Sequence, residues 1–462
     1  MCCAEAVNQS AVMLVCKEIT IINKQVAQEP GGNSHGVCGN KKNVDMRYSN
    51  VKVRLVVLSF LQFAVWGAYL TSMGRYLGSV GMGSSIGWFY SVQGIVSIFM
   101  PAIVGIIADR WVQAQRMLAF CHAMAALFMG ITGYIGMTEG TTVAFNDIFW
   151  TYTLAVAFYM PTLALSNSVS YSVLGRAGLD TVKAFPPIRV FGTVGFVVSM
   201  LLVDVTGFQN DCNQFFASAV WGVAVALYSL TLPPCPVDSA GGHRSLVSLL
   251  GLDAFRLFRV RRMALFFIFA MLLGAALQVS NGYANTFISG FGAYAEYAGT
   301  FAVEHTNVLI SLSQMSEILC ILLIPFFLKR FGIKRVMLVA MVAWVFRFGF
   351  FAIGDPGMPG VLLFVLSMLV YGVAFDFFNI SGSLFVDKEV PEGQRSSAQG
   401  LFMLMTNGLG ASVGVVAAQG VVNHFTAHQT DFQGWTAAWL VFAGYALVVA
   451  VLFALVFKEK KE

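Results

Sequence analysis

Two acidic residues stand inside apolar stretches of the sequence. Asp376 interrupts "YGVAFDFFNISGS" (371–383), and Glu317 ends "SQMSE" (313–317). A carboxylate at the centre of a lipid bilayer costs at least about 2.5–3.5 kcal/mol, so it needs a proton, a partner or a water-filled cavity. Because protonation removes the charge and its penalty, such a pair is suited to binding and releasing a proton while the protein reorients. The chemistry indicated is proton coupling.

Asp376 belongs to a polar stripe that runs beside an aromatic one. On a wheel of about 100° per residue, the polar stripe contains Asp376, Asn379 and Ser383. The aromatic stripe contains Tyr371, Phe375 and Phe378. Since lipid excludes polar groups, we expect both stripes to face the protein interior. The alternative for each ring is simple packing against neighbouring helices.

Three more apolar segments place polar side chains on one helical face. These are Gln278, Asn281 and Asn285 in one segment, Gln314 and Glu317 in the next, and Arg189, Thr193 and Phe196 in an earlier one. Amides offer donors and acceptors to sugar hydroxyls and to base edges, and aromatic rings offer stacking faces. The pattern predicts a neutral, hydroxylated ligand with a flat part. The alternatives are amides that only join helices and a structural ion pair between an acid and Arg189 or Arg347.

Motifs of other function classes are absent from the sequence. There is no glycine-rich phosphate loop, so ATP binding by this chain is not expected, and no paired nucleophile and base indicates an enzyme. We expect no cofactor and no metal site. His424 and His428, near Asp431, are interpreted as solvated loop residues, and the cysteine spacings predict neither a metal site nor a disulfide.

The elements that carry these residues are long and apolar. The chain has 462 residues, of which 57% are hydrophobic and 11% charged, whereas soluble domains contain about 25% charged residues. Twelve apolar blocks approach the roughly 20 residues that a helix needs to cross a bilayer. They are 54–74, 86–108, 117–137, 146–170, 189–208, 214–233, 263–288, 305–328, 335–354, 361–385, 397–422 and 434–457. The prediction is an all-α membrane protein with twelve transmembrane helices.

The basic residues predict the orientation. After residue 50, the lysines and arginines outside the spans fall on one set of connections, apart from Arg75. Because basic residues stay on the cytoplasmic side, both termini are expected there. The net charge of +5 is therefore a topology signal, and no nucleic-acid partner is expected.

The chain divides into two six-helix halves. We expect an N-terminal extension (1–50) that is disordered or outside the mature fold, halves at 51–233 and 263–458, a cytoplasmic loop (234–262) and a tail (459–462). The loop "GIIADRW" (105–111) is echoed by "KRFGIKR" (329–335). In the first, Gly105 permits close packing, and Asp109 and Arg110 can form an interlock. Together these features resemble the major facilitator superfamily, whose halves rock about a site near the membrane midplane.

Longer motifs resemble one family within that fold. They are "LSFLQFAVWGAYLTSMGRYL" (58–77), "FYMPTLALSNSVSY" (158–171), "FPPIRVFGTVGF" (185–196), "FFIFAMLLGAALQVSN" (266–281), "AFDFFNISGSLFVDKEV" (374–390) and "RSSAQGLFMLMTNG" (395–408). From about residue 51 to 458 the chain is similar to the nucleoside:proton symporters. The resemblance implies import of purine and pyrimidine nucleosides with protons across a bacterial inner membrane, without cofactor or obligate protein partner.

The resemblance also implies roles for individual residues. The nucleoside-binding set is Arg189, Thr193, Phe196, Gln278, Asn281, Gln314, Glu317, Tyr371 and Phe375. Asp376 and Glu317 are expected to couple the proton, since Ala276 stands where relatives can have another acid. The closest alternative is a proton-coupled sugar or disaccharide symporter of the same fold. A non-transporting receptor is less favoured because no long soluble stretch follows residue 50.

Overall fold

The structure is a computed structural model that describes residues 50–235, 252–391, 394–427 and 433–457. The chain divides into two compact units, Met1–Ser49 and Asn50–Glu462, and the described residues all belong to the second. The predictions made for residues 1–49, for most of the central loop, for the tail and for His428 and Asp431 lie outside the described residues.

The described part of the chain is helical and contains no strand. The N half consists of α3 (Val51–Gly67), α4 (Met73–Ser79), α5 (Ile86–Arg110), α6 (Ala114–Glu139), α7 (Phe145–Arg176), α8 (Thr181–Val205) and α9 (Asn213–Ser229). The C half consists of α11 (Arg261–Gly290), α12 (Phe301–Glu304), α13 (Thr306–Ile353), α14 (Val361–Glu389), α15 (Arg395–Met403), a π-helix (Leu404–Gly410), α16 (Ala411–Thr426) and α17 (Gln433–Val456). Short 3-10 helices include η1 (Gly83–Ser85), η3 (Phe208–Asn210) and η4 (Leu252–Arg259).

These helices confirm the predicted all-helical membrane fold. Within the described residues, nine helices are long and apolar enough to cross a membrane. One of them, the 48-residue α13, breaks at Gly332 (φ 79°, ψ 168°) and so holds two predicted spans. Glycine permits this positive φ at no steric cost. The 17-residue α3 and α9 correspond to the first and sixth spans.

The start of α8 differs from the prediction. The fifth span was expected to begin at residue 189, but α8 already begins at Thr181 and contains Pro186 and Pro187. Proline has no N–H for the helical ladder and is disfavoured inside a helix. Membrane helices tolerate such prolines because neighbouring helices and side chains satisfy the freed carbonyls.

Glycines let the helices that carry the candidate site pack closely. A Cβ at Gly195 of α8 would overlap the backbone of Phe60 in α3, and one at Gly372 of α14 would overlap the backbone of Ser316 in α13. Small residues at helix interfaces are the usual route to close packing in membranes. The pairs α3–α8 and α13–α14 are therefore held at short range.

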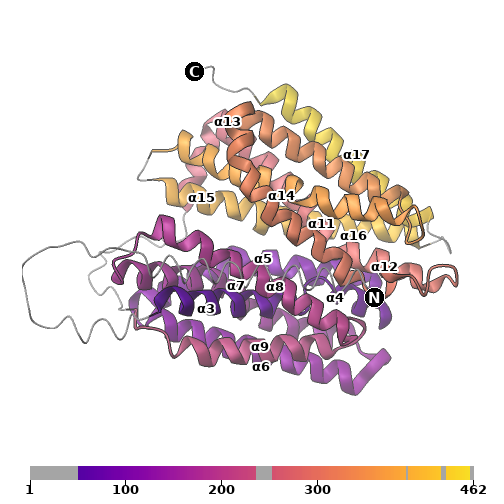
Figure 1. Cartoon of the computed structure of the whole chain (residues 1–462), viewed down its shortest axis with the longest axis horizontal. Coiled ribbons are helices and arrows are strands. Elements are labelled where there is room, and N and C mark those ends of the chain that lie inside the picture. The colour runs from indigo at the N-terminus through magenta and orange to yellow at the C-terminus, as the bar shows by residue number, and fades with distance from the viewer. Residues whose placement is uncertain (1–49, 236–251, 392–393, 428–432, 458–462) are drawn as a thin grey trace, which may run out of the picture. The chain divides into compact units, whose positions relative to one another are not determined.

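The two halves meet at one end of the bundle, which we call the closed end. In Figure 1 the helices run roughly horizontally, with the N half below, the C half above, and α4 and α12 toward the right. Contacts join α4 to α11, α5 to α16 and the π-helix, and α8 to α13. Every hydrogen bond between described residues of the two halves involves residues 71–91 or 204–209 of the N half and residues 303–307 or 412–423 of the C half. These four stretches define the closed end.

Candidate functional site

The predicted site residues come from both halves. The N half contributes Arg189, Thr193 and Phe196 on α8. The C half contributes Gln278 and Asn281 on α11, Gln314 and Glu317 on α13, and Tyr371, Phe375 and Asp376 on α14. Helix α8 contacts α13 across the halves, and Arg189 interacts electrostatically with Glu317 of the opposite half.

The two acids and Arg189 form one electrostatic group. Glu317 and Asp376 are close enough to repel each other as charges, and Arg189 attracts Glu317 across the halves. Within the described chain this attraction is not a direct ion pair, because no Arg189–Glu317 contact is as short as 4.0 Å. The guanidinium of Arg189 instead lies 3.9 Å from the centre of the Phe63 ring.

Asp376 has no polar partner for one of its oxygens. The residue is 3% exposed, and its Oδ2 makes no hydrogen bond to any described residue. A buried polar group without a partner is costly, and a buried charge more so. The structural ion pair considered for Asp376 is thus not found among the described residues.

Tyr371 is held in place by several neighbours. Its ring stacks on Phe375 with centroids 6.0 Å apart and meets Trp344 edge-on at 6.0 Å. Gln314 lies beside its hydroxyl group. The guanidinium of Arg347 lies 4.5 Å from the ring centre. These contacts fix the plane of an aromatic pair, Tyr371 and Phe375, at the site.

Arg347, which the sequence left without a role, joins three helices of the C half. It is 2% exposed. Its Nε and Nη2 donate to Ser280 Oγ at 2.9 and 2.7 Å, and its Nη1 donates to the Ser367 carbonyl at 2.7 Å. Arg347 therefore supports the Tyr371 ring, and its shortest hydrogen bonds go to a hydroxyl and a carbonyl group.

The polar residues of α11 split between two places. Asn281 donates to Gln278 Oε1 at 3.2 Å, so these two amides stay together. Asn285, on the same predicted face, donates to Asn307 Oδ1 at 2.8 Å. Asn307 belongs to the closed end, where it also bonds Thr71. The polar face of α11 thus serves the candidate site at one level and the contact between halves at another.

Two residues of the predicted stripes on α14 take part in packing. Phe378 stacks on Phe266 at 6.1 Å and lies near Phe402, all within the C half. Ser383 donates to Gln399 of α15 at 3.1 Å. Phe378 and Ser383 therefore contact neighbouring helices of the C half. A single long helix such as α14 has different neighbours along its length, so residues of one stripe need not share one environment.

Trp66 of α3 is a neighbour of the site that the sequence analysis missed. Its ring lies 6.5 Å from Phe196 and 6.0 Å from Tyr159. Its Nε1 donates to Gln93 Oε1 at 3.3 Å. The signal was present in "LQFAVWG" (61–67), where Gln62 and Trp66 are one helical turn apart.

The predicted interlock is only partly described. Gly105 lies on α5, while the side chains of Asp109 and Arg110 lie outside the described residues. A Cβ at Gly105 would meet no atom of the described residues within 4 Å, so the close packing expected there is not found among them. The halves make their contacts at the closed end, and Gly105 lies toward the other end of α5.

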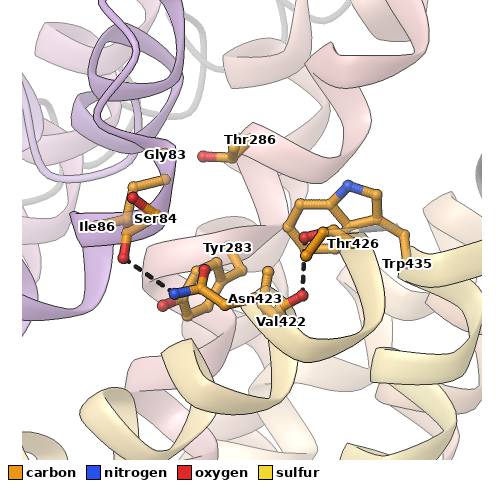
Figure 2. Close-up of a pocket in the computed structure, with 10 residues that line it drawn as sticks. Gly83, Ser84, Ile86, Tyr283, Thr286, Val422, Asn423, Thr426 and Trp435 are labelled. Carbon is orange, nitrogen blue, oxygen red and sulfur yellow. Dashed lines mark hydrogen bonds between the residues drawn. The ribbon is translucent and has the colours of Figure 1, made fainter. Parts of the chain in front are cut away.

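A cavity of about 380 Å³ lies at the closed end and contains none of the predicted site residues. Figure 2 shows Ser84 from the N half facing Tyr283, Asn423 and Trp435 from the C half. Asn423 donates to the Ser84 carbonyl at 3.2 Å (Figure 2). This hydrogen bond joins the halves beside the cavity. Within the described residues no three His, Cys, Asp or Glu side chains gather to hold a metal ion.

Comparisons with known proteins agree with this fold. The family model for the nucleoside H+ symporters matches residues 49–462. The xanthosine permease of Escherichia coli K12 is 49% identical over 411 residues, covering 88% of this chain and 96% of the permease. Nucleoside permease NupG of the same strain is 46% identical over 413 residues, covering 89% and 97%.

A solved structure supports the same assignment. The crystal structure of the nucleoside transporter NupG superimposes with a TM-score of 0.81 at 46% identity, covering 89% of this chain and all of that one. These relatives are transporters rather than enzymes. The chain belongs to the nucleoside H+ symporter family.

Proposed function

We propose that this protein imports purine and pyrimidine nucleosides together with protons across a bacterial inner membrane by alternating access. Family membership and the likeness to permeases for xanthosine and for nucleosides support the substrate class. The observation that carries the mechanism is the arrangement of charges: Arg189 of one half attracts Glu317 of the other without a direct ion pair, and Asp376 lies beside Glu317.

The nucleoside is bound by groups from both halves. Gln278, Asn281 and Gln314 supply amides for ribose hydroxyls and base edges. Tyr371 and Phe375 supply one stacking face, and Phe196 supplies another from the N half. Arg189 and Thr193 complete the polar side of α8. Contacts from both halves make binding sensitive to their relative position, as alternating access requires.

Proton coupling rests on Asp376 and Glu317. A carboxylate in a membrane interior is costly as a charge and cheap when protonated. Proton binding weakens the repulsion between the two acids and the attraction of Glu317 for Arg189. The attraction between Glu317 and Arg189 crosses the halves and therefore depends on their relative position, so protonation of Glu317 and reorientation affect one another.

The closed end faces the outside of the cell. Arg75 lies at this end, where its Nη1 donates to the Val303 carbonyl at 3.1 Å. The basic residues of the other connections, among them Arg54, Arg176 and Arg330, follow the rule that basic loops remain cytoplasmic. The halves are therefore joined at the outer end, and both termini lie on the cytoplasmic side.

Uptake in cells that lack their own nucleoside carriers tests this function. Labelled uridine, adenosine and xanthosine are supplied with and without an uncoupler. We expect saturable uptake that the uncoupler abolishes and that unlabelled nucleosides block, whereas maltose and free ribose do not. Uptake of a sugar in place of every nucleoside, or nucleoside accumulation that persists in the uncoupler, would contradict the proposal.

A further inference from the structure

Asp204 belongs to the N half, but the hydrogen-bond partners of its side chain belong to the C half. Its Oδ2 lies 2.6 Å from Nδ1 of His305, and its Oδ1 accepts the backbone N–H of Asn307 at 3.1 Å. The Asp204 side chain is completely buried, whereas that of His305 is 40% exposed. A buried carboxylate thus has both oxygens satisfied only while the two halves touch.

The contact also caps a helix. His305 is the N-cap residue of α13, and Asn307 lies in the first turn of that helix. The first N–H groups of a helix lack partners within it, and the helix dipole favours an anion at that end. Asp204 supplies this anion from the opposite half. Separation of the halves would therefore uncap α13 and expose a carboxylate at the same time.

The groups around Asp204 bind the same short segment of the C half, residues 303–307. Arg75 of α4 attracts Asp204 and donates to the Val303 carbonyl. Gln209 of η3 donates to the Glu304 carbonyl at 2.9 Å, while the Glu304 side chain is exposed. Asp211, which follows η3, accepts from Asn213 instead.

Among the residues that the structure describes, two charged groups therefore face Asp204. They are Arg75 from α4 and His305 from the start of α13. Arginine stays protonated at any physiological pH. Histidine is the side-chain type that changes charge between about pH 5 and 8, and the imidazole Nδ1 of His305 lies 2.6 Å from Asp204 Oδ2.

We propose that the contact between Asp204 and His305, which we call the outer latch, holds the two halves together at the closed end during the transport cycle. This contact is stronger when the outside of the cell is acidic. A protonated imidazole adds charge attraction to the hydrogen bond with the carboxylate, and a neutral imidazole retains only the hydrogen bond. Low pH outside the cell thus favours contact between the halves at the closed end, and a rise in pH weakens that contact. The outward position of the latch rests on the orientation in the proposed function.

Hydrogen–deuterium exchange of the purified, nucleoside-free protein tests the latch. The variants are Asp204→Asn and His305→Gln, which keep size and hydrogen bonding, with Glu304→Gln as the exposed neighbouring control. Exchange is measured at pH 6 and pH 8 and corrected for its intrinsic pH dependence. One readout is the exchange of residues 303–309. The other is the exchange of α5 and α16 around Gly87 and Gln419, where the Gly87 N–H donates to Gln419 Oε1 at 2.6 Å across the halves. This second contact does not involve Asp204 or its partners.

For Asp204→Asn we expect exchange about tenfold faster in both readouts, which corresponds to about 1.4 kcal/mol, because the charge-assisted hydrogen bonds across the halves are weakened. The wild type should exchange faster at pH 8 than at pH 6 in both, and His305→Gln should lose this difference. Glu304→Gln should behave as the wild type.

Faster exchange confined to 303–309 would mean a local cap only and would overturn the latch. Exchange equal to wild type in both variants at both pH values would do so as well. If Asp204→Asn does not fold, the pH response of His305→Gln decides. Because no nucleoside is present, these outcomes are independent of the substrate proposed above.

Discussion

The guanidinium group of Arg347 lies 4.5 Å from the centre of the Tyr371 ring. The same group donates to Ser280 and to the Ser367 carbonyl, so it ties α11 and α14 to α13. An arginine can stack on a ring and make several fixed hydrogen bonds at once because its guanidinium is planar. Arg347 is thus a positioning residue for the aromatic pair of the site.

Replacement of Arg347 by lysine should disturb that position. A lysine ammonium is a compact donor that cannot span Ser280 and the Ser367 carbonyl while stacking on Tyr371. We expect the melting temperature of Arg347→Lys in detergent to fall by at least about 2–4 °C, with weaker nucleoside binding. Arg330→Lys, at an exposed position, is the matched control. Unchanged melting and binding in Arg347→Lys would rule out the positioning role.

The amide and aromatic residues of the site should affect binding rather than folding. In Gln278→Ala, Asn281→Ala and Phe375→Ala, we expect weaker nucleoside affinity at an unchanged melting temperature. Each lost hydrogen bond should cost about 0.5–1.5 kcal/mol, or up to about 3 kcal/mol if its partner stays buried. Isothermal titration of purified variants measures this, with the exposed Asn146→Ala as control. Wild-type affinity in all three would place the site elsewhere.

The contacts at the closed end should form only if α5 and α16 approach each other closely. A Cβ at Gly94 would lie 2.8 Å from the Gly408 carbonyl oxygen and overlap Ser412 as well. Gly94→Val should therefore separate the halves at this end and raise the labelling of closed-end residues by reagents added from outside. Gly420→Val is the control, since a Cβ at Gly420 of α16 meets nothing within 4 Å. Equal labelling of the two variants would argue against a tight α5–α16 contact.

Much of the fold could be predicted from the sequence because the bilayer restricts it. Long apolar runs located the helices, and only details depended on tertiary structure. One is the early start of α8 with Pro186 and Pro187 inside it, which neighbouring helices make tolerable. Another is the break at Gly332, which joins two predicted spans into one element.

The site could be predicted less completely, because a helical wheel gives a direction but no neighbour. It grouped Asp376 with Ser383, yet Ser383 bonds Gln399 of α15. It could not assign Arg347, whose partners come from other helices. Asp204 was missed since its partner lies on the opposite half, and no periodicity within one segment reports such a contact.

In the proposed mechanism Asp376 and Glu317 couple proton entry to nucleoside entry. Asp376→Asn and Glu317→Gln keep size and hydrogen bonding but cannot release a proton. Both variants should still exchange labelled for unlabelled nucleoside across proteoliposome membranes, since exchange needs reorientation without net proton movement. Exchange serves as the internal control for folding.

The most direct test is nucleoside accumulation by Asp376→Asn in proteoliposomes under an imposed pH gradient. One pH unit corresponds to about 1.36 kcal/mol, so one proton per nucleoside drives at most about tenfold accumulation in the wild type. We expect Asp376→Asn to exchange nucleoside but to reach no internal excess. Accumulation by Asp376→Asn to the wild-type level, with Glu317→Gln behaving in the same way, would contradict it.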